Sequence, residues 1–446
     1  MFDNARLPAR HLPWLLLAAG CGPGSPPVGS SGTGQPTSTS SSIATAAPPA
    51  TSSPAETPAP APRPARLAAG GAHACAWTED GRAYCWGSDE HGQVGERAPD
   101  PPPPPAPSAS APGGLLGLGG FGGPLAGKTC TSPLSPPVRC WNNAYSPRKL
   151  AVGPVDEIAP GRDHTCARLR GGAVSCWGRD LLGRNDAKAW AVPGIGGAVQ
   201  LASGVWHTCA RLGDGTVRCW GDNDKGQLGD GTLEKRTAPV AVKGLSGVID
   251  IAAAVGLSCA RLADETLRCW GWNTLAGGDN EHWKEQPEPA EVKGLGPVAG
   301  VTVGGGRVCA WKRDGALFCW GHNTSGEIGD GTTEHRASPV RVDVGGPVAQ
   351  AAAGGSHTCA LRRDGKVLCW GRNHVAQIGL DPRQEKQPRP VEVPGLEGTT
   401  GLAAGGDFTC ARTREDRVLC WGASFHGQAG RSEAHVKVPA EVIFGN

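Results

Sequence analysis

Sixteen of the 17 cysteines in this chain stand in pairs whose members are ten positions apart. This spacing recurs eight times, and successive pairs begin at intervals of about 36 to 55 residues. Intervals of this length are typical of propeller blades and of other folds that stack one repeated unit. The repeat therefore constrains the fold more than any other feature of the sequence. The pairs are Cys75 and Cys85, Cys130 and Cys140, Cys166 and Cys176, Cys209 and Cys219, Cys259 and Cys269, Cys309 and Cys319, Cys359 and Cys369, and Cys410 and Cys420.

Each cysteine pair brackets a predicted β-hairpin, and the segment 204–221 is a clear copy. Asp214-Gly215 supplies the left-handed backbone that a tight hairpin turn requires, and alternating runs flank it. An even offset of ten places Cys209 and Cys219 on the same face of the ribbon, directly opposite each other. Their Cβ atoms are then close enough for a bridge. We therefore predict one disulfide within each of the eight hairpins.

Zinc binding is the alternative use of paired cysteines. Metal sites favour two to four residues between paired cysteines, whereas nine separate the members of each pair here. We therefore favour disulfides and predict no metal and no cofactor. A disulfide closing so short a loop contributes roughly 2–3 kcal/mol in the chain-entropy model, and its formation needs an oxidising compartment.

The N-terminus independently indicates export. Arg6 and Arg10 precede a short apolar run at 12–19, which leads into Gly20-Cys21. This run is too short to cross a bilayer, which takes about 20 residues, so residues 1–20 read as a secretory signal peptide. The small residues before Cys21 resemble the lipobox of bacterial lipoproteins, which implies lipidation of Cys21; an ordinary signal peptide with a nearby free thiol is the alternative. We expect an outer-membrane or cell-surface lipoprotein, or else a periplasmic or secreted protein.

Composition divides the rest of the chain. Residues 21–65 are almost wholly Gly, Ser, Thr, Pro and Ala, and they cannot bury enough apolar surface to offset their ordering entropy. We predict a disordered tether there and a second disordered Pro- and Gly-rich insertion at about 98–127. The folded part is expected to span 66–446. Because the chain contains 69 Gly and 40 Pro, both poor helix formers, an all-β fold is predicted.

A tryptophan follows the second cysteine of every pair. A ring repeated at one position of a stacked unit is most simply a core residue that packs between neighbouring sheets and against the bridge. A platform for carbohydrate or a cofactor is the alternative. A histidine precedes the first cysteine in only four of the copies, so we expect it to be structural or to donate a local hydrogen bond. The eight predicted blade-core residues are Trp86, Trp141, Trp177, Trp220, Trp270, Trp320, Trp370 and Trp421, and the four histidines are His73, His164, His207 and His357.

The remaining submotifs complete a blade. After Trp220-Gly221 come Gly226-Gln227-Leu228-Gly229, then Pro239-Val240, then a strand at about 248–253. Four short strands in a period of about 50 residues make one propeller blade. The order of these submotifs over 66–446 resembles the regulator of chromosome condensation (RCC1) repeat, which implies a closed β-propeller, usually of seven blades. The hairpin count favours eight blades, with seven as the alternative if the unit around Cys130 folds outside the ring.

The sequence favours binding over catalysis. With 43 Lys and Arg against 41 Asp and Glu, the net charge is +2, so the basic footprint of a nucleic-acid-binding protein is missing. No nucleophile, base and orienting group recur at a recognisable spacing, so no enzyme is predicted. The resemblance implies protein partners bound through blade loops. Nucleotide exchange on a small GTPase and chromatin binding need a cytoplasmic or nuclear setting, and an exported chain excludes both.

We therefore expect an exported, lipid-anchored, monomeric propeller that binds a protein, or a cell-envelope polymer, through loops such as 222–225 that follow each Trp-Gly. Its only contact with the membrane would be the lipid anchor. Two alternatives remain: a structural spacer in the envelope, and a hydrolase or lyase with its site at the propeller axis. Converging ionisable side chains with displaced pKa values at the axis would favour the enzyme.

Overall fold

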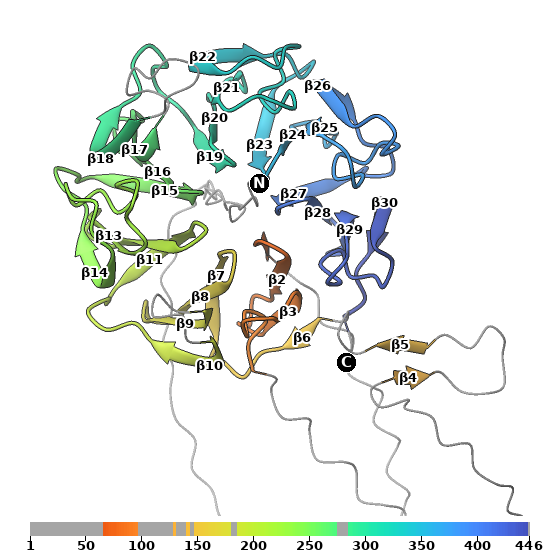
Figure 1. The fold of residues 1–446 in the computed structure, drawn as a ribbon, viewed down its shortest axis with the longest axis horizontal. Helices are drawn as coiled ribbons and strands as arrows, with labels where there is room; N and C mark the ends of the chain where they lie inside the picture. The colour runs from red at the N-terminus through yellow and green to blue at the C-terminus, as the bar shows by residue number, and fades with distance from the viewer. Residues whose placement is uncertain are drawn as a thin grey trace, which may run out of the picture. The chain divides into compact units, whose positions relative to one another are not determined.

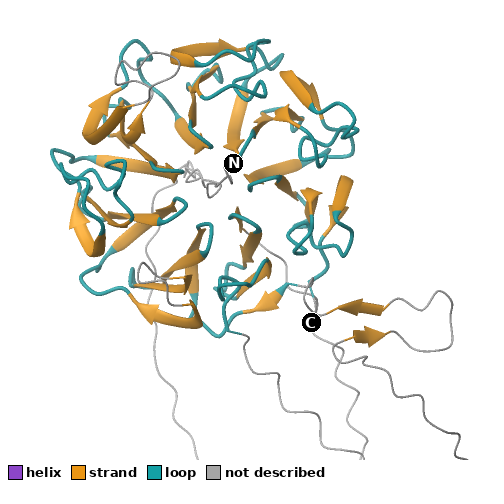
Figure 2. Ribbon diagram, viewed as in Figure 1, coloured by secondary structure: helices purple, strands orange, loops and turns teal. Residues whose placement is uncertain are grey.

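A computed structural model describes residues 66–96, 128–130, 140–142, 147–179, 185–273 and 284–444, all within one unit of the chain. The described residues form strands and loops (Figure 2). The predicted signal peptide, Cys21, the tether 21–65 and the insertion at 98–127 lie outside them, and those expectations stay predictions. In the ranges given above, no helix is long and apolar enough to span a membrane.

Seven four-stranded antiparallel sheets follow one another around a ring (Figure 1). The first strand of each sheet lies nearest the axis, and the fourth lies at the rim. Short strands joined by tight turns are what a chain rich in Gly and Pro forms most readily, and radial repetition leaves only short sheet edges. The sheets are blades 1 to 7 in chain order, and the all-β propeller is confirmed.

The strand bounds are as follows. Blade 1 contains β1 Arg66–Ala69, β2 His73–Trp77, β3 Ala83–Gly87 and β6 Arg148–Lys149. Blade 2 contains β7 Val155–Pro160, β8 His164–Leu169, β9 Val174–Arg179 and β10 Asn185–Ala191. Blade 3 contains β11 Ala198–Ser203, β12 His207–Leu212, β13 Val217–Gly221 and β14 Arg236–Ala241. Blade 4 contains β15 Val248–Ala254, β16 Leu257–Leu262, β17 Leu267–Asn273 and β18 Lys284–Glu291. Blade 5 contains β19 Gly300–Gly304, β20 Arg307–Trp311, β21 Leu317–Gly321 and β22 Arg336–Val342. Blade 6 contains β23 Val348–Ala353, β24 His357–Arg362, β25 Val367–Arg372 and β26 Lys386–Glu392. Blade 7 contains β27 Thr399–Ala404, β28 Phe408–Thr413, β29 Val418–Ala423 and β30 His435–Glu441.

The central hairpin of each blade carries its own disulfide. In blade 3, Cys209 lies opposite Cys219 in the register of β12 and β13, and Gly215 takes the left-handed conformation at the turn, with φ +79°. The predicted pairing is confirmed in all seven blades. The bridges join Cys75 to Cys85, Cys166 to Cys176, Cys209 to Cys219, Cys259 to Cys269, Cys309 to Cys319, Cys359 to Cys369, and Cys410 to Cys420.

The favoured count of eight blades is wrong, and the alternative of seven is confirmed. The hairpin of Cys130 and Cys140 forms β4 Lys128–Cys130 and β5 Cys140–Asn142, which pair with each other as a separate two-stranded sheet. The strand expected to complete an eighth blade is β6, and it pairs instead with the free edge of β3. The hairpin is therefore an insertion within blade 1. The side chains of Cys130, Cys140 and Trp141 lie outside the described set.

The core lies between successive blades, and the motif tryptophans build it. Trp270 of blade 4, for example, belongs to the same buried cluster as Cys209 and Cys219 of blade 3. The same relation holds at every junction, so each tryptophan lies in a cluster with the disulfide of the preceding blade. Trp220 is partly buried. The fully buried members are Trp86, Trp177, Trp270, Trp320, Trp370 and Trp421.

The ring closes between blade 7 and blade 1. The predicted first strand at Arg66–Ala69 is confirmed as β1. The predicted last strand at 441–444 is shifted, because β30 ends at Glu441 and the following residues leave the sheet. Phe444 instead packs edge-on against Trp86, with 5.6 Å between ring centroids. The indole Nε1 of Trp86 also donates to the carbonyl oxygen of Gln428 at 3.1 Å.

Candidate functional site

The described loops that the sequence singles out lie at one end of the blades. Because the four strands of a blade are antiparallel and paired in order, the link from first to second strand and the link from third to fourth emerge at the same end. In blade 3 these links are 204–206 and 222–235. We call this end the loop face. The hairpin turns and the connections between blades lie at the opposite end.

A repeated hydrogen-bond network lies beneath the loop face. At the junction of blades 3 and 4, the carbonyl oxygen of Gln227 accepts from Ser258 Oγ at 3.0 Å and from Trp270 Nε1 at 3.0 Å. His207 Nε2 lies 2.9 Å from Ser258 Oγ. Because Ser258 gives its own proton to Gln227, His207 is the donor and carries its proton on Nε2. We call this arrangement the inter-blade latch.

The latch recurs around the ring and gives the repeated histidines their role. At the junction of blades 6 and 7, His357 Nε2 donates to Thr409 Oγ1 at 2.8 Å, and Thr409 donates to the carbonyl of Gln377 at 2.8 Å. His73 and Thr165 form the same contact at 2.8 Å between blades 1 and 2. In each case the hydroxyl comes from the next blade and lies one position before the first cysteine of that blade: Thr165 before Cys166, Ser258 before Cys259 and Thr409 before Cys410.

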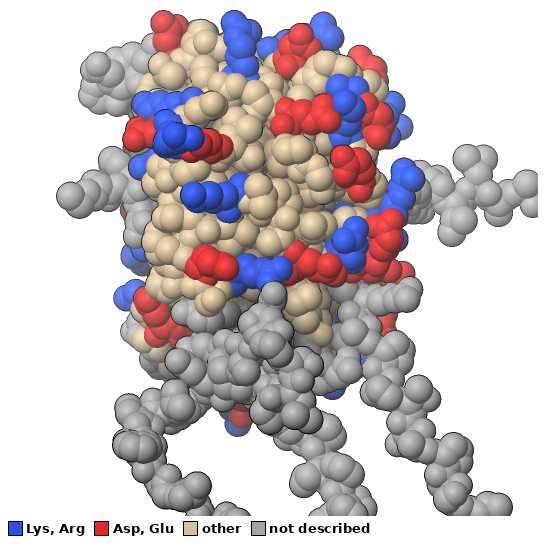
Figure 3. Space-filling view, turned by 90° about the vertical axis from the view of Figure 1, so that its right-hand side faces the viewer, with Lys and Arg blue, Asp and Glu red and all other residues tan. Residues whose placement is uncertain are grey.

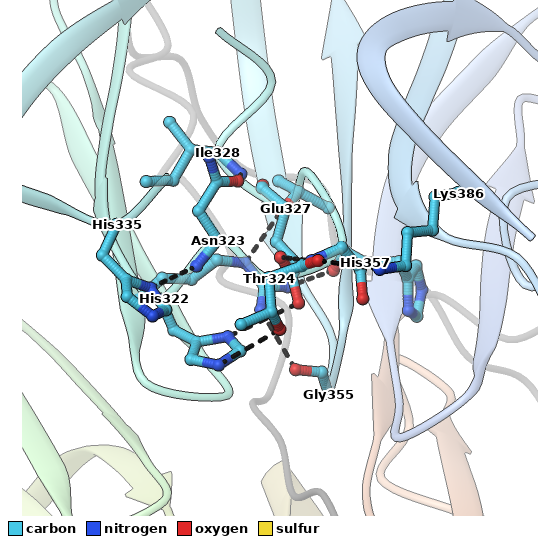
Figure 4. Close-up of polar contacts among 12 residues, drawn as sticks. His322, Asn323, Thr324, Glu327, Ile328, His335, Gly355, His357 and Lys386 are labelled. Carbon is cyan, nitrogen blue, oxygen red and sulfur yellow. Dashed lines mark hydrogen bonds and ion pairs between the residues drawn. The ribbon is translucent and has the colours of Figure 1, made fainter. Parts of the chain in front are cut away.

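Blade 5 carries a charged version of the latch (Figure 4). Arg307 replaces the histidine, and its guanidinium donates to Thr358 Oγ1 at 2.9 Å and to the carbonyl of Gly355 at 3.0 Å. Burial lowers the pKa of Arg307 to about 10. Glu327 replaces the glutamine. Burial acts to raise the pKa of Glu327, but the hydrogen bond from His322 and the charge of Arg307 outweigh it and hold this pKa below its usual value.

Ionisable side chains on the inner strands join successive blades. Glu157 of β7 lies 3.4 Å from Arg168 and accepts a hydrogen bond from the backbone N–H of Leu201 in β11 at 2.9 Å. Burial raises the pKa of Glu157. Gln200 repeats this contact by accepting a hydrogen bond from the backbone N–H of Ile251 in β15 at 3.1 Å, and it also donates to Asp250 at 2.8 Å. These groups serve blade packing, and among the described residues no three His, Cys, Asp or Glu gather as a metal site.

Three large apolar side chains project from the loop face. They are Trp206, 47% exposed, Leu233, 50% exposed, and Phe425, 57% exposed. The charged side chains visible on one flank of the unit are of both signs and lie beside one another (Figure 3). The loop face therefore presents separate exposed apolar side chains above the latches. On the flank shown in Figure 3, neither positive nor negative side chains predominate.

Comparison with known protein families identifies the repeat. A family model described as the regulator of chromosome condensation (RCC1) repeat matches residues 214–261, 314–361 and 364–412. A second model of the same description matches 65–93, 198–227, 348–377 and 400–428. The chain contains RCC1 repeats in these ranges. The matched ranges include the latch residues Gln227, Ser258, Gln377 and Thr409, so the latch is built from the RCC1 repeats themselves.

Solved structures share the propeller. Prp20p of Saccharomyces cerevisiae superposes with a TM-score of 0.61 and 19% identity, over 79% of this chain and 83% of that one. Human WBSCR16 superposes with a TM-score of 0.59 and 19% identity, over 71% and 89%. The RCC1 domain-containing mitochondrial protein RUG3 of Arabidopsis thaliana is 46% identical over 56 residues, which are 12% of this chain and 13% of that protein's length. These likenesses establish the fold.

The described loops therefore share one face of the propeller, but sequence reasoning missed the most prominent exposed aromatic side chain of blade 3. Trp206 lies one residue before the latch histidine of blade 3. The other six blades have small or acidic residues at this position, namely Ala72, Asp163, Gly256, Gly306, Ser356 and Asp407. An alignment of the repeats with one another would have found it.

Proposed function

We propose that this RCC1-repeat propeller is an exported, lipid-anchored, monomeric scaffold that binds a protein partner on its loop face. The observation that carries the proposal is the contrast between the inter-blade latches, which recur with the same geometry at several junctions, and the exposed loop residues above them, which differ from blade to blade. Variation on a fixed frame is how repeat scaffolds present a binding surface. We propose no catalysis, because the ionisable groups described on the inner strands serve blade-to-blade contacts.

Two further observations support the proposal. Prp20p, which shares the fold, has binding properties toward Gsp1p and histones. Seven disulfides are present in the described residues, and such a number is stable only in an oxidising compartment, which supports export. The lipid anchor rests on the sequence around Cys21.

Site-specific photo-crosslinking tests the binding face. A photoreactive residue replaces Phe425 on the loop face, and a matched one replaces Ile249, which is 39% exposed at the opposite end of blade 4. We expect the full-length oxidised protein to capture the same partner from envelope extract at position 425 and not at 249. No capture at either position would favour the structural spacer, and equal capture at both would contradict a binding face.

Membrane partition tests the anchor separately. We expect the chain to fractionate with membranes and to carry an added lipid mass on its N-terminal cysteine. Cys21→Ser should release the protein into the soluble fraction while leaving its disulfides intact. An unchanged partition, or an unmodified mature N-terminus, would contradict lipidation and leave an ordinary exported protein.

A further inference from the structure

A cleft of about 540 Å³ lies between blades 2 and 3. Three tryptophans line it: Trp190 from β10, Trp206 from the loop face and Trp220 from the end of β13. Its volume falls within the range of about 300–1,000 Å³ that is usual for sites of small ligands.

The cleft forms where the repeat is shortened. The chain advances 21 positions from Cys219 in β13 to its partner Val240 in β14, but 14 from Cys176 in β9 to its partner Trp190 in β10, a difference of seven. The sequence between β9 and β10 has no Gly-Gln-Leu-Gly segment. In blade 3 that segment provides the Gln227 carbonyl, which accepts a hydrogen bond from Trp270 of the next blade. Blade 2 lacks the segment, and Trp220 of the blade that follows it is partly exposed, whereas its counterparts are buried.

The position of Trp206 is not explained by folding. The other six blades fold with a small or acidic residue at this position, so the fold does not need an indole there. Trp206 is 47% exposed, and its orientation is maintained by two contacts with blade 2. Its Nε1 donates to Asp163 Oδ2 at 3.5 Å, and the guanidinium of Arg162 lies 5.7 Å from the ring centroid. An aromatic face held this way in a cleft is arranged to contact a ligand.

The polar lining carries balanced charge. Its charged residues are Asp222, Asp224, Arg179 and Lys235, and Lys235 Nζ lies 2.6 Å from Asp222 Oδ1. The two histidines of the lining are neutral at pH 7, because burial lowers the pKa of His164 to about 4 and that of His207 to about 3. The formal charge of this lining is therefore zero, with hydrogen-bond donors and acceptors both present.

We propose that this cleft binds a neutral carbohydrate. The C–H face of a pyranose ring is weakly positive and packs on the negative face of an indole, while its hydroxyls donate to Asp222 and Asp224 and accept from Arg179 and Lys235. A cationic ligand fits less well because Arg162 already lies over Trp206. An anionic ligand would meet the two aspartates. The cleft opens beside Trp206 on the loop face, and carbohydrate binding there is tested without a protein partner.

Titration with neutral oligosaccharides tests the site. The full-length oxidised protein is titrated with maltotriose, cellotriose and N,N′,N″-triacetylchitotriose, with tryptophan fluorescence and calorimetry as readouts. We expect at least one of these to bind with a change in fluorescence. Trp206→Ala should weaken that binding at least tenfold without lowering the melting temperature, and Phe425→Ala, an exposed aromatic on the same face but outside the cleft, should leave it unchanged.

A second variant keeps the test decisive if Trp206→Ala alters stability. Asp224 is exposed at the rim of the cleft, and Asp224→Ala should weaken the same sugar several-fold. The proposal is overturned if none of the three oligosaccharides binds, if binding survives both substitutions, or if a trimethyllysine peptide binds in the cleft while the sugars do not.

Discussion

Lowering the pH from 7 to 5 should destabilise the propeller through its buried histidines, and His207 allows the sharpest test. This side chain is 1% exposed, and its Nε2 is the donor in the latch to Ser258. Its Nδ1 has no hydrogen-bond partner among the described residues, so a proton added there would be buried without an acceptor. Burial accordingly lowers the pKa of His207 to about 3 from the ordinary 6.5.

The size of the effect follows from proton linkage. As the pH falls below 6.5, the unfolded chain takes up a proton at His207 and the folded chain does not, so the unfolded state is favoured. At pH 5 this single histidine lowers the free energy of unfolding by about 2 kcal/mol relative to pH 7. The size of this change is set by the pKa of His207 in the unfolded chain, because the folded chain stays unprotonated at His207 over the whole range from pH 7 to pH 5. The loss continues until the pH reaches the folded pKa.

Urea unfolding at pH 7 and pH 5 measures this directly. His207→Leu places at this position the residue that blade 4 has naturally as Leu257, and it should reduce the pH dependence of stability by about 2 kcal/mol. Ser258→Ala is the matched control, because it removes the same hydrogen bond but keeps the titrating group, so it should lower stability similarly at both pH values. A His207→Leu protein that keeps the full pH dependence would refute the reasoning.

Two further predictions concern the bridges and the latch. Replacing Cys209 and Cys219 together by alanine should lower the free energy of unfolding by about 2–3 kcal/mol, because the loop constraint on the unfolded chain is lost; an unchanged urea midpoint would contradict this. Thr409→Val should cost about 2–3 kcal/mol, because the ring of His357 and the carbonyl of Gln377 each lose a buried partner. Thermal unfolding measures that loss, and a change within about 0.5 kcal/mol would show that the latch contributes little.

The hairpins, the disulfide bridges and the repeated tryptophans were predictable from the sequence, because each depends on residues that lie only a few positions apart along the chain. Cys209 and Cys219 are ten positions apart on one ribbon, and the Asp214-Gly215 turn between them sets their register. Once the register of a hairpin is set, the facing of its side chains follows from the alternation of the strands. The same spacing pattern also indicated export and an all-β array.

The number of blades, the latches and the tryptophan cleft were decided only by the tertiary structure. Strand β6 pairs with the edge of β3 although a long insertion separates them in the sequence. The local sequence of a strand does not determine which sheet edge it will pair with. His207 contacts Ser258 across 51 positions, and Trp190 and Trp206 line one cleft only because two blades pack together. Contacts between repeats depend on how the units stack, and a pattern read within one repeat carries no information about its neighbour.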